Sequence, residues 1–156
     1  MVDNLINERI AKKIANSGLC SRREAERLIN NGCVKLNGNV IKNCNINVTT
    51  KDIIEVNNQK LKAKKKVKLW LYYKRHGVLV TTKDIQGRPN IFDEIKLKIN
   101  KRLISIGRLD FNSEGLLLLT NNGDFARKLE LPQNKFQRTY KAVSYTHLTL
   151  PTIYSV

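Results

Sequence analysis

The sequence predicts an α+β protein in which a small ααβ unit is followed by a second unit built around a sheet. Apolar residues recur at helical spacing near the N-terminus and then alternate at strand spacing from Val34 onward. The second unit contains several apolar stretches that are typical of strands, with one helical stretch after the last of them. Six lysines between Lys60 and Lys68 separate the two parts, because so dense a run of charge cannot pack into a core.

Two short helices are expected first. Ile10 and Ile14 give the first helix an apolar face, and Gly18 is suited to end it. Ser21 is expected to start the second helix, because Ser21-Arg22-Arg23-Glu24 fits a capping box in which the serine hydroxyl and the glutamate bind free backbone N–H groups. The buried stripe of the second helix is predicted to comprise Ala25, Leu28 and Ile29.

Hairpins are expected next. The residues from Val34 to Leu36 alternate between apolar and polar, and Asn37-Gly38 is a strong signal for a type I′ turn. The return strand is predicted to begin at Val40, and a second pair of strands is expected around Asn57-Asn58. These hairpins complete the first unit.

The second unit is predicted to contain a substantial sheet. Alternating apolar residues indicate strands at the following positions: Leu69, Leu71, Tyr73, Val78 and Val80. A connection rich in turn-forming residues follows, and a further short strand leads to Gly107. The run Leu116–Leu119 is apolar on both faces, so it is predicted to be a central strand, with a turn and a helix after it.

Charge points to a polyanionic partner. The 156 residues carry 29 Lys and Arg against 13 Asp and Glu, a net charge of +16. Residues 1–66 and residues 67–156 each contribute +8, so both parts are expected to face the same polyanion, of which nucleic acid is the commonest. No apolar stretch approaches the roughly 20 residues of a membrane span, and the N-terminus lacks the apolar region of a signal peptide. We therefore expect a cytoplasmic protein that does not enter the membrane.

Cysteine and histidine do not indicate a metal site. Cys20, Cys33 and Cys44 form no CxxC pair, and their odd number favours reduced thiols. The two histidines, His76 and His147, are too few for a histidine-rich site. The sequence therefore predicts no metal.

Two groups of charged residues are open to two interpretations from the residues alone. Arg22, Arg23 and Arg27 form either a solvated helix face or a face that binds phosphate. Asp110 follows one apolar strand and precedes another, so it lies at the rim of the sheet, either as a turn residue bonded to its own backbone or as a functional carboxylate. Arg108 could equally form a structural ion pair.

The first unit resembles a known RNA-binding domain. The stretch "SGLCSRREAERLINNGCVKLNGNVI" is similar to the small domain named after ribosomal protein S-four, and the similarity covers residues 8–61. It implies that the second helix and the hairpin bind structured RNA through Arg22, Arg23, Arg27 and Lys35. Residues 62–67 are then a basic linker, which adds electrostatic attraction to RNA.

The second unit resembles the RNA pseudouridine synthases, in the branch that modifies ribosomal RNA and carries the same N-terminal domain. The similar segments are "LYYKRHGVLVTTKDIQGRPNIFD", "GRLDFNSEGLLLLTNNGDFARKLELP" and "RTYKA". The resemblance implies a catalytic domain with a mixed or antiparallel sheet, of which residues 68–142 form the N-terminal part. It also implies that Asp110 is the catalytic aspartate, that Arg108 contacts phosphate or supports the displaced RNA, and that Tyr140 stacks on the flipped uracil.

The implied reaction converts a specific uridine of ribosomal RNA to pseudouridine without a cofactor, in a monomer. The wording of "GRPNIFD" and "GLLLLT" is closer to the members that act on the large subunit. The rival hypothesis is a non-catalytic RNA-binding protein that acts through residues 8–61. A DNA-binding protein is disfavoured, because the sequence has no helix-turn-helix or zinc-finger signal.

Two departures from the family pattern stand out. Arg75 follows Lys74 where family members commonly have proline, which concerns the stiffness of the loop. The family also continues for about another half-domain, with a late basic residue that pairs with the aspartate, whereas residues 143–156 contain no charged residue. We expect the catalytic domain to be incomplete, with 143–156 a non-family tail that is either translated read-through or an apolar strand. The 156-residue chain is then expected to bind RNA but to be inactive.

Overall fold

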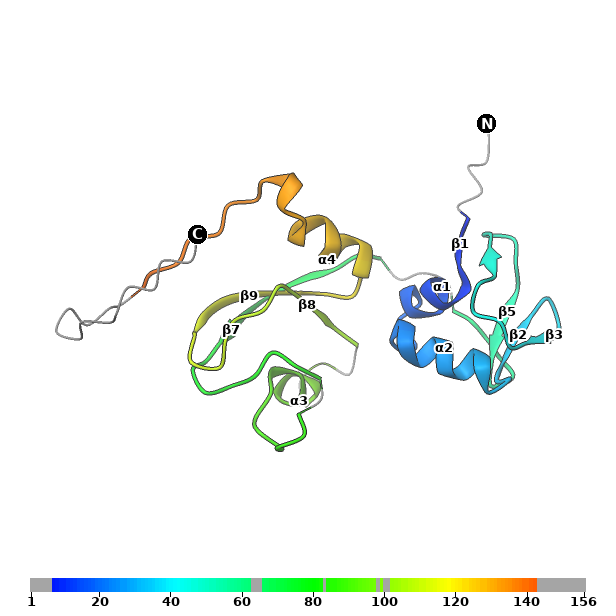
Figure 1. Cartoon of the computed structure of the whole chain (residues 1–156), viewed down its shortest axis with the longest axis horizontal. Helices are drawn as coiled ribbons and strands as arrows, with labels where there is room; N and C mark the ends of the chain where they lie inside the picture. Colours follow the sequence, from blue (N-terminus) through cyan, green and yellow to red (C-terminus); the bar gives the residue numbers. More distant parts are fainter. Residues whose placement is uncertain (1–6, 63–65, 83, 98, 100–101, 143–156) are drawn as a thin grey trace, which may run out of the picture.

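The computed structural model describes residues 7–62, 66–82, 84–97, 99 and 102–142. They form an α+β protein with two separate hydrophobic cores (Figure 1). The first core lies between two helices and the small strands of the N-terminal half, from Ile10 to Val56. The second lies beneath a three-stranded sheet, from Val78 to Leu119.

Two helices cover the first core, as the apolar spacing predicts. They are α1 (Ile10–Asn16) and α2 (Arg22–Asn30). Ile10 and Ile14 are fully buried in α1. The hydroxyl Oγ of Ser21 accepts a hydrogen bond from the backbone N–H of Glu24 at 3.1 Å, so the predicted serine cap of α2 is confirmed. The Glu24 carboxylate lies 3.4 Å from the Arg27 guanidinium.

The strands of the first half pair antiparallel in a four-stranded sheet of order β3-β2-β5-β6. Its members are β2 (Val34–Leu36), β3 (Asn39–Ile41), β5 (Ile54–Val56) and β6 (Gln59–Lys60). Asn37 and Gly38 have φ of 50° and 87°, as a type I′ turn requires, so the predicted hairpin is confirmed. Asn57 and Asn58, with φ of 50° and 60°, make the second hairpin. A two-stranded pair, β1 (Glu8–Arg9) with β4 (Asn47–Val48), lies beside α1.

The second half is organised around an antiparallel sheet of order β7-β9-β8. The strands are β7 (Leu69–Lys74), β8 (Ile104–Ile106) and β9 (Gly115–Thr120). The predicted central position of the leucine-rich strand is confirmed, because β9 pairs with a neighbour on each side. Two helices accompany the sheet, α3 (Ile91–Lys96) and α4 (Gly123–Glu130), and a short 3-10 turn, η1 (Pro132–Asn134), follows α4.

Three predicted features of the second half need correction. The buried face of β7 carries Trp70 and Tyr72, whereas the predicted alternating residues Leu69, Leu71 and Tyr73 lie on its exposed face. Every position from 69 to 73 is apolar or aromatic, so alternation could not identify the core face.

The predicted strand at Val78 and Val80 is reduced to one bridge between Leu79 and Asn90. Two hydrogen bonds form this bridge: Leu79 N–H donates to Pro89 O at 2.9 Å, and Ile91 N–H donates to Leu79 O at 3.0 Å. The connection after it was expected to be irregular but contains α3. The Asn90 side chain caps this helix by accepting from Asp93 N–H at 3.0 Å, a sequence signal that was overlooked.

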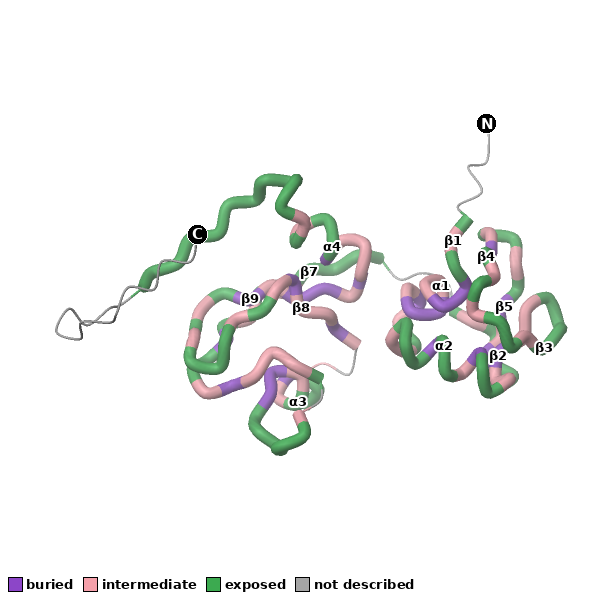
Figure 2. The backbone as a smooth tube through the Cα atoms, viewed as in Figure 1, coloured by how far each residue is buried: buried purple, intermediate pink, exposed green. Residues whose placement is uncertain are grey.

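The basic segment between the halves is fastened at its C-terminal end. The Asn121 side chain accepts from Lys68 N–H at 2.8 Å and donates to Lys66 O at 2.9 Å. The described end of the predicted linker at 62–67 is therefore held by the turn after β9. The C-terminal end of the described chain is open to solvent, in contrast, since residues 132–142 are exposed throughout (Figure 2).

Candidate functional site

Asp110 lies in the loop that joins β8 to β9, at the rim of the sheet as the sequence predicts. Its backbone carbonyl accepts a hydrogen bond from Ser113 N–H at 3.1 Å, so Asp110 opens a turn. The residue is exposed. Within the described chain, no basic group lies within ion-pair distance of its carboxylate. The carboxylate is therefore presented to solvent at the edge of the sheet.

Lys74 holds this loop from beneath. It is the last residue of β7, and it is fully buried. Its Nζ donates hydrogen bonds to three backbone carbonyls, those of Arg75 at 3.1 Å, Phe111 at 3.3 Å and Ser113 at 2.6 Å. Three donors on one ammonium group match three acceptors, so the buried charge is fully hydrogen-bonded. Two of these carbonyls belong to the loop, one directly after Asp110.

The electrostatic environment of Lys74 links it to the same loop. Burial lowers the pKa of Lys74, while the negative charges of Asp110 and Glu114 act in the opposite direction. The sequence reasoning missed this residue. The available signal was a single lysine at the end of the apolar run "LWLYYK", where a charged residue needs a specific partner if the strand is buried.

Two further contacts fix the ends of the loop. The Glu130 carboxylate, at the end of α4, accepts a hydrogen bond from Gly107 N–H at 2.7 Å. On the other side, Gly77 N–H donates to Phe111 O at 2.9 Å. The position of Asp110 therefore depends on β7, on the loop after it and on α4 together. Lys74 and Gly77 both lie far from Asp110 in the sequence.

The two other residues implied for substrate contact are placed differently. Arg108 is exposed and lies two residues before Asp110 in the same loop. Tyr140 is 68% exposed, in the segment that leaves α4 and runs away from the sheet (Figure 1). The structure therefore brings Arg108, but not Tyr140, to the neighbourhood of the aspartate.

The predicted RNA-binding residues of the first half are accessible. Arg22, Arg23 and Arg27 are exposed on the first two turns of α2. Lys35 is half-buried in β2, where its cross-strand neighbour is the acidic Glu55. The arginines present their charge to solvent more freely than the lysine does.

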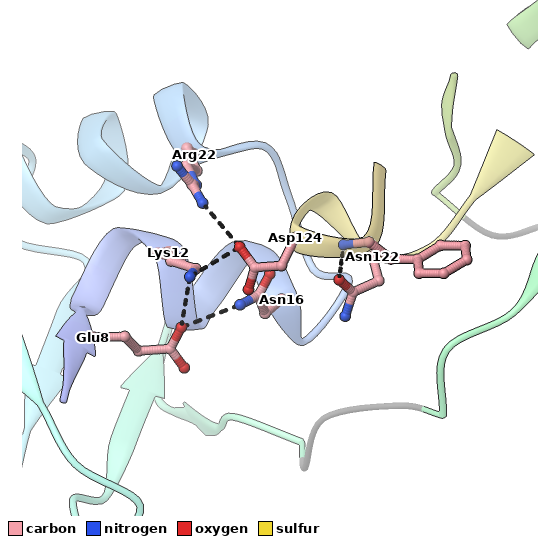
Figure 3. Close-up of polar contacts among 7 residues, drawn as sticks. Glu8, Lys12, Asn16, Arg22, Asn122 and Asp124 are labelled. Atoms are coloured by element: carbon pink, nitrogen blue, oxygen red, sulfur yellow. Dashed lines mark hydrogen bonds and ion pairs between the residues drawn. The ribbon is translucent and has the colours of Figure 1, made fainter. Parts of the chain in front are cut away.

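An ion pair joins the two halves of the protein (Figure 3). The Asp124 carboxylate, in the first turn of α4, lies 2.9 Å from Lys12 Nζ of α1 and 3.8 Å from Arg22 Nη2 of α2. Glu8 approaches Lys12 from the other side at 3.9 Å. The cap of α4 is Asn122, whose side chain accepts from Phe125 N–H at 2.9 Å. Asp124 is therefore not needed as the cap of α4, and its carboxylate forms the contact between the halves.

Two classes of feature are absent from the part of the chain that the structure describes. None of its helices has the length and apolar character needed to cross a bilayer. Its Cys, His, Asp and Glu side chains form no group of three or more that could hold a metal ion.

Comparison with known families identifies both halves. The profile of the family described as RNA pseudouridylate synthase matches residues 68–153, and the S4 domain profile matches residues 8–54. The chain belongs to the RNA pseudouridylate synthase family and carries an S4 domain in its N-terminal half. The family match continues to residue 153, into the stretch 143–156 for which a non-family tail is predicted. That stretch lies outside the described residues, and the predicted domain boundaries stay predictions.

Several relatives have related names. A protein from Rickettsia bellii, named "Uncharacterized RNA pseudouridine synthase", is 49% identical over 88% of this chain and 59% of its own length. The "Ribosomal large subunit pseudouridine synthase B" of Bacillus subtilis is 45% identical over 86% of this chain and 54% of its own length. The protein of the same name from Buchnera aphidicola subsp. Baizongia pistaciae is 42% identical over 91% and 60%.

The chain therefore spans somewhat more than half the length of these relatives. A solved structure described as "Crystal structure of pseudouridylate synthase" is 25% identical and superposes with a TM-score of 0.40, covering 81% of this chain and 54% of that chain.

Proposed function

We propose that this chain supplies the RNA-binding part and the aspartate-bearing part of an enzyme that converts a specific uridine of ribosomal RNA to pseudouridine. The observation that carries the proposal is the exposed carboxylate of Asp110 on a loop anchored by the buried Lys74. The family of residues 68–153 supports the reaction. The names of the Bacillus and Buchnera relatives support the large subunit as the source of the RNA.

The reaction requires a group that acts on the sugar or on the base. The bond between C1′ of the ribose and N1 of uracil breaks, the base rotates, and a bond between C1′ and C5 forms. The proton of C5 is lost, and N1 ends with a proton, so atoms and electrons balance without an oxidant or a reductant. The Asp110 carboxylate can attack the sugar, stabilise the cleaved species or abstract a proton. An exposed and rigidly supported carboxylate is suited to each of these roles.

The uridine must leave the RNA stack before it reaches Asp110, at a cost of a few kcal/mol. In the proposal, Arg108 binds a phosphate or supports the displaced strand beside the aspartate. Tyr140 stacks on the flipped uracil, which requires its segment to approach the loop when RNA is bound. No cofactor takes part, and the protein acts as a monomer on RNA rather than DNA, in the cytoplasm where ribosomal RNA is found.

The proposed RNA-binding surface of the first half comprises Arg22, Arg23, Arg27 and Lys35. Arg22 and Arg23 lie at the N-terminus of α2, where free N–H groups also favour phosphate, and Arg27 lies farther along the helix. Replacing Arg23 by Glu removes a charge that has no ion pair among the described residues. We expect weaker binding to folded ribosomal RNA and a salt dependence shallower by about one unit. Lys96→Glu, on the exposed side of α3, is the matched control.

The test of the reaction is tritium release from C5 of labelled uridine in large-subunit ribosomal RNA. It uses a longer form in which the segment of the Rickettsia bellii relative beyond the matched region is joined after Ala142. Asp110→Asn preserves size but removes the charge, so turnover should fall at least about a thousandfold while RNA binding persists. Asp93→Asn, an equivalent change on α3, should retain turnover within about tenfold.

Turnover like that of the parent protein in Asp110→Asn would refute the catalytic assignment and return Asp110 to a structural role in its turn. If the longer form binds RNA tightly but releases no tritium, the non-catalytic alternative, binding through residues 8–61, is favoured. The 156-residue chain is measured in parallel. It is expected to bind RNA and to release little tritium, because the described residues place no basic partner against the Asp110 carboxylate.

A further inference from the structure

A groove of about 640 Å³ separates α2 from the second half of the protein. One wall carries arginines of α2, and the other is formed by one side of α4, by Ile104 at the start of β8 and by Arg102, two residues before it. The charged residues that line the groove are Arg22, Arg23, Glu24, Arg27, Arg102, Asp124, Arg127 and Glu130. Five of them are arginines and three are acidic, so the groove is positive on balance.

The acidic residues of the groove are already engaged. Glu24 lies against Arg27, and Glu130 accepts from the backbone of Gly107. Asp124 contacts Lys12 and Arg22. All three carboxylates that line the groove therefore form contacts within the protein.

Three of the five arginines that line the groove have no ion pair within the described part of the chain: Arg23, Arg102 and Arg127. Arg102 is half-buried, and burial lowers its pKa, which reflects the cost of removing a guanidinium from water. It lies close enough to Cys20, in the first half, to act on the pKa of that thiol. A half-buried guanidinium that lines a groove without a paired carboxylate is suited to an external anion.

We propose that this groove binds the phosphate backbone of the RNA, and that Asp124 occupies Lys12 and Arg22 until a phosphate group displaces it. This inference rests on the proposed function, which supplies RNA as the partner. It adds Arg102 and Arg127, from the second half, to the binding surface of α2. The site is therefore built by both halves together.

The position of the groove favours RNA over an acidic protein. β8 begins at Ile104 in the groove and ends at Ile106, about 7 Å farther at the usual rise of a strand, and the Asp110 loop follows. A strand of RNA that lies along α2 and through the groove is thereby led toward the aspartate. Guanidinium groups on both walls also match the phosphates of one backbone.

The ion pair of Asp124 is suited to exchange. The Lys12 and Asp124 side chains are 30% and 44% exposed, and exposed pairs contribute little to stability. A phosphate that replaces the carboxylate loses little and gains the charge of both cations. In the absence of RNA, the same carboxylate limits binding of other polyanions.

The test measures binding of the 156-residue chain to a fluorescein-labelled folded fragment of large-subunit ribosomal RNA, as a function of salt. Arg102→Gln and Arg127→Gln should each weaken binding about three- to tenfold and reduce the salt slope by about 0.7 to 0.9. Lys128→Gln is the matched control, because it removes one charge from the same exposed helix outside the groove. Thermal unfolding verifies that each variant is folded. If Arg102→Gln does not fold, Arg127→Gln still tests the groove, because Arg127 is exposed.

Asp124→Asn tests the exchange and should bind RNA at least about threefold more tightly than the parent chain. Asp84→Asn is the matched control, because it also removes a carboxylate that pairs with an arginine, Arg88, but outside the groove, and it should change affinity much less. Equal effects of Arg127→Gln and Lys128→Gln, or an unchanged affinity of Asp124→Asn, would overturn the proposal. Unchanged RNA binding by both arginine variants would likewise overturn it and assign the groove to an acidic protein.

Failure here is distinguishable from failure of the proposed function. If the groove is wrong, the arginine variants bind RNA normally while Asp110→Asn still abolishes tritium release in the longer form. If the reaction is wrong, no tritium is released although the arginine variants lose affinity and salt dependence.

Discussion

The Nζ of Lys74 donates a 2.6 Å hydrogen bond to the carbonyl of Ser113, three residues after Asp110, although Lys74 itself is fully buried. Burying an ammonium group is costly unless its donors are satisfied, and here three backbone carbonyls satisfy them. The loop and the lysine therefore depend on each other.

We expect Lys74→Met to lower the free energy of unfolding by about 1–3 kcal/mol, because three backbone carbonyls lose a charged hydrogen-bond donor. The methionine fills most of the space, so the effect isolates the hydrogen bonds. Urea unfolding measures the loss, and limited proteolysis should show cleavage between Gly107 and Gly115. The control is Lys68→Met, an exposed lysine just before β7. Equal stability of the two variants would show that the ammonium does not support the loop.

Asp52 should make the first half sensitive to acid. Its pKa is lowered to about 2, first by the backbone N–H of Thr49 and then by the Asn37 amide and the Thr49 hydroxyl. Because the pKa in the folded protein lies below the unfolded value, the stabilisation is present above about pH 4 and is lost as the pH falls toward 2. We expect Asp52→Asn to be less stable than the parent chain at pH 6, with the difference vanishing near pH 2. Thermal unfolding across this range measures it, and a constant difference would contradict the assignment.

Asn122 should contribute more to α4 than Asp124 does. Its side chain is buried and caps the helix by accepting from Phe125 N–H. We expect Asn122→Ala to destabilise the protein by about 1 kcal/mol, as loss of a cap does. Asp124→Asn keeps this cap and removes only exposed ion pairs, so its effect on stability should be smaller. Thermal unfolding followed by circular dichroism compares them, and a larger loss in Asp124→Asn would reverse the assignment.

The outer face of the three-stranded sheet is apolar and open. Leu71 and Leu116 are 74% and 66% exposed on neighbouring strands. Replacing both by Thr, which suits strands, should change the free energy of unfolding by less than about 0.5 kcal/mol and reduce binding of a hydrophobic dye. Leu119→Thr, on the buried face of β9, should instead cost about 2–4 kcal/mol. Unchanged dye binding by the double variant would show that this face is not the exposed apolar surface.

Features whose signals lie within a few residues could be predicted from the sequence alone. The Ser21 cap, the Asn37-Gly38 turn and the central place of β9 follow from local hydrogen bonding, positive φ and unbroken apolar character. The rim position of Asp110 follows in the same way, because a polar residue between two apolar strands must lie where they connect. The catalytic interpretation of Asp110, in contrast, came from the family resemblance.

Features that depend on packing between distant segments became known only from the three-dimensional fold. The buried face of β7 was set by the core beneath Trp70 and Tyr72, since all residues from 69 to 73 were apolar enough for either face. The anchoring of the Asp110 loop by Lys74, and the contact of Asp124 with Lys12, join residues about 40 and 110 positions apart. Hydrogen bonds and ion pairs of this kind act over a few ångströms in space whatever their separation along the chain, so no pattern of neighbouring residues contains them.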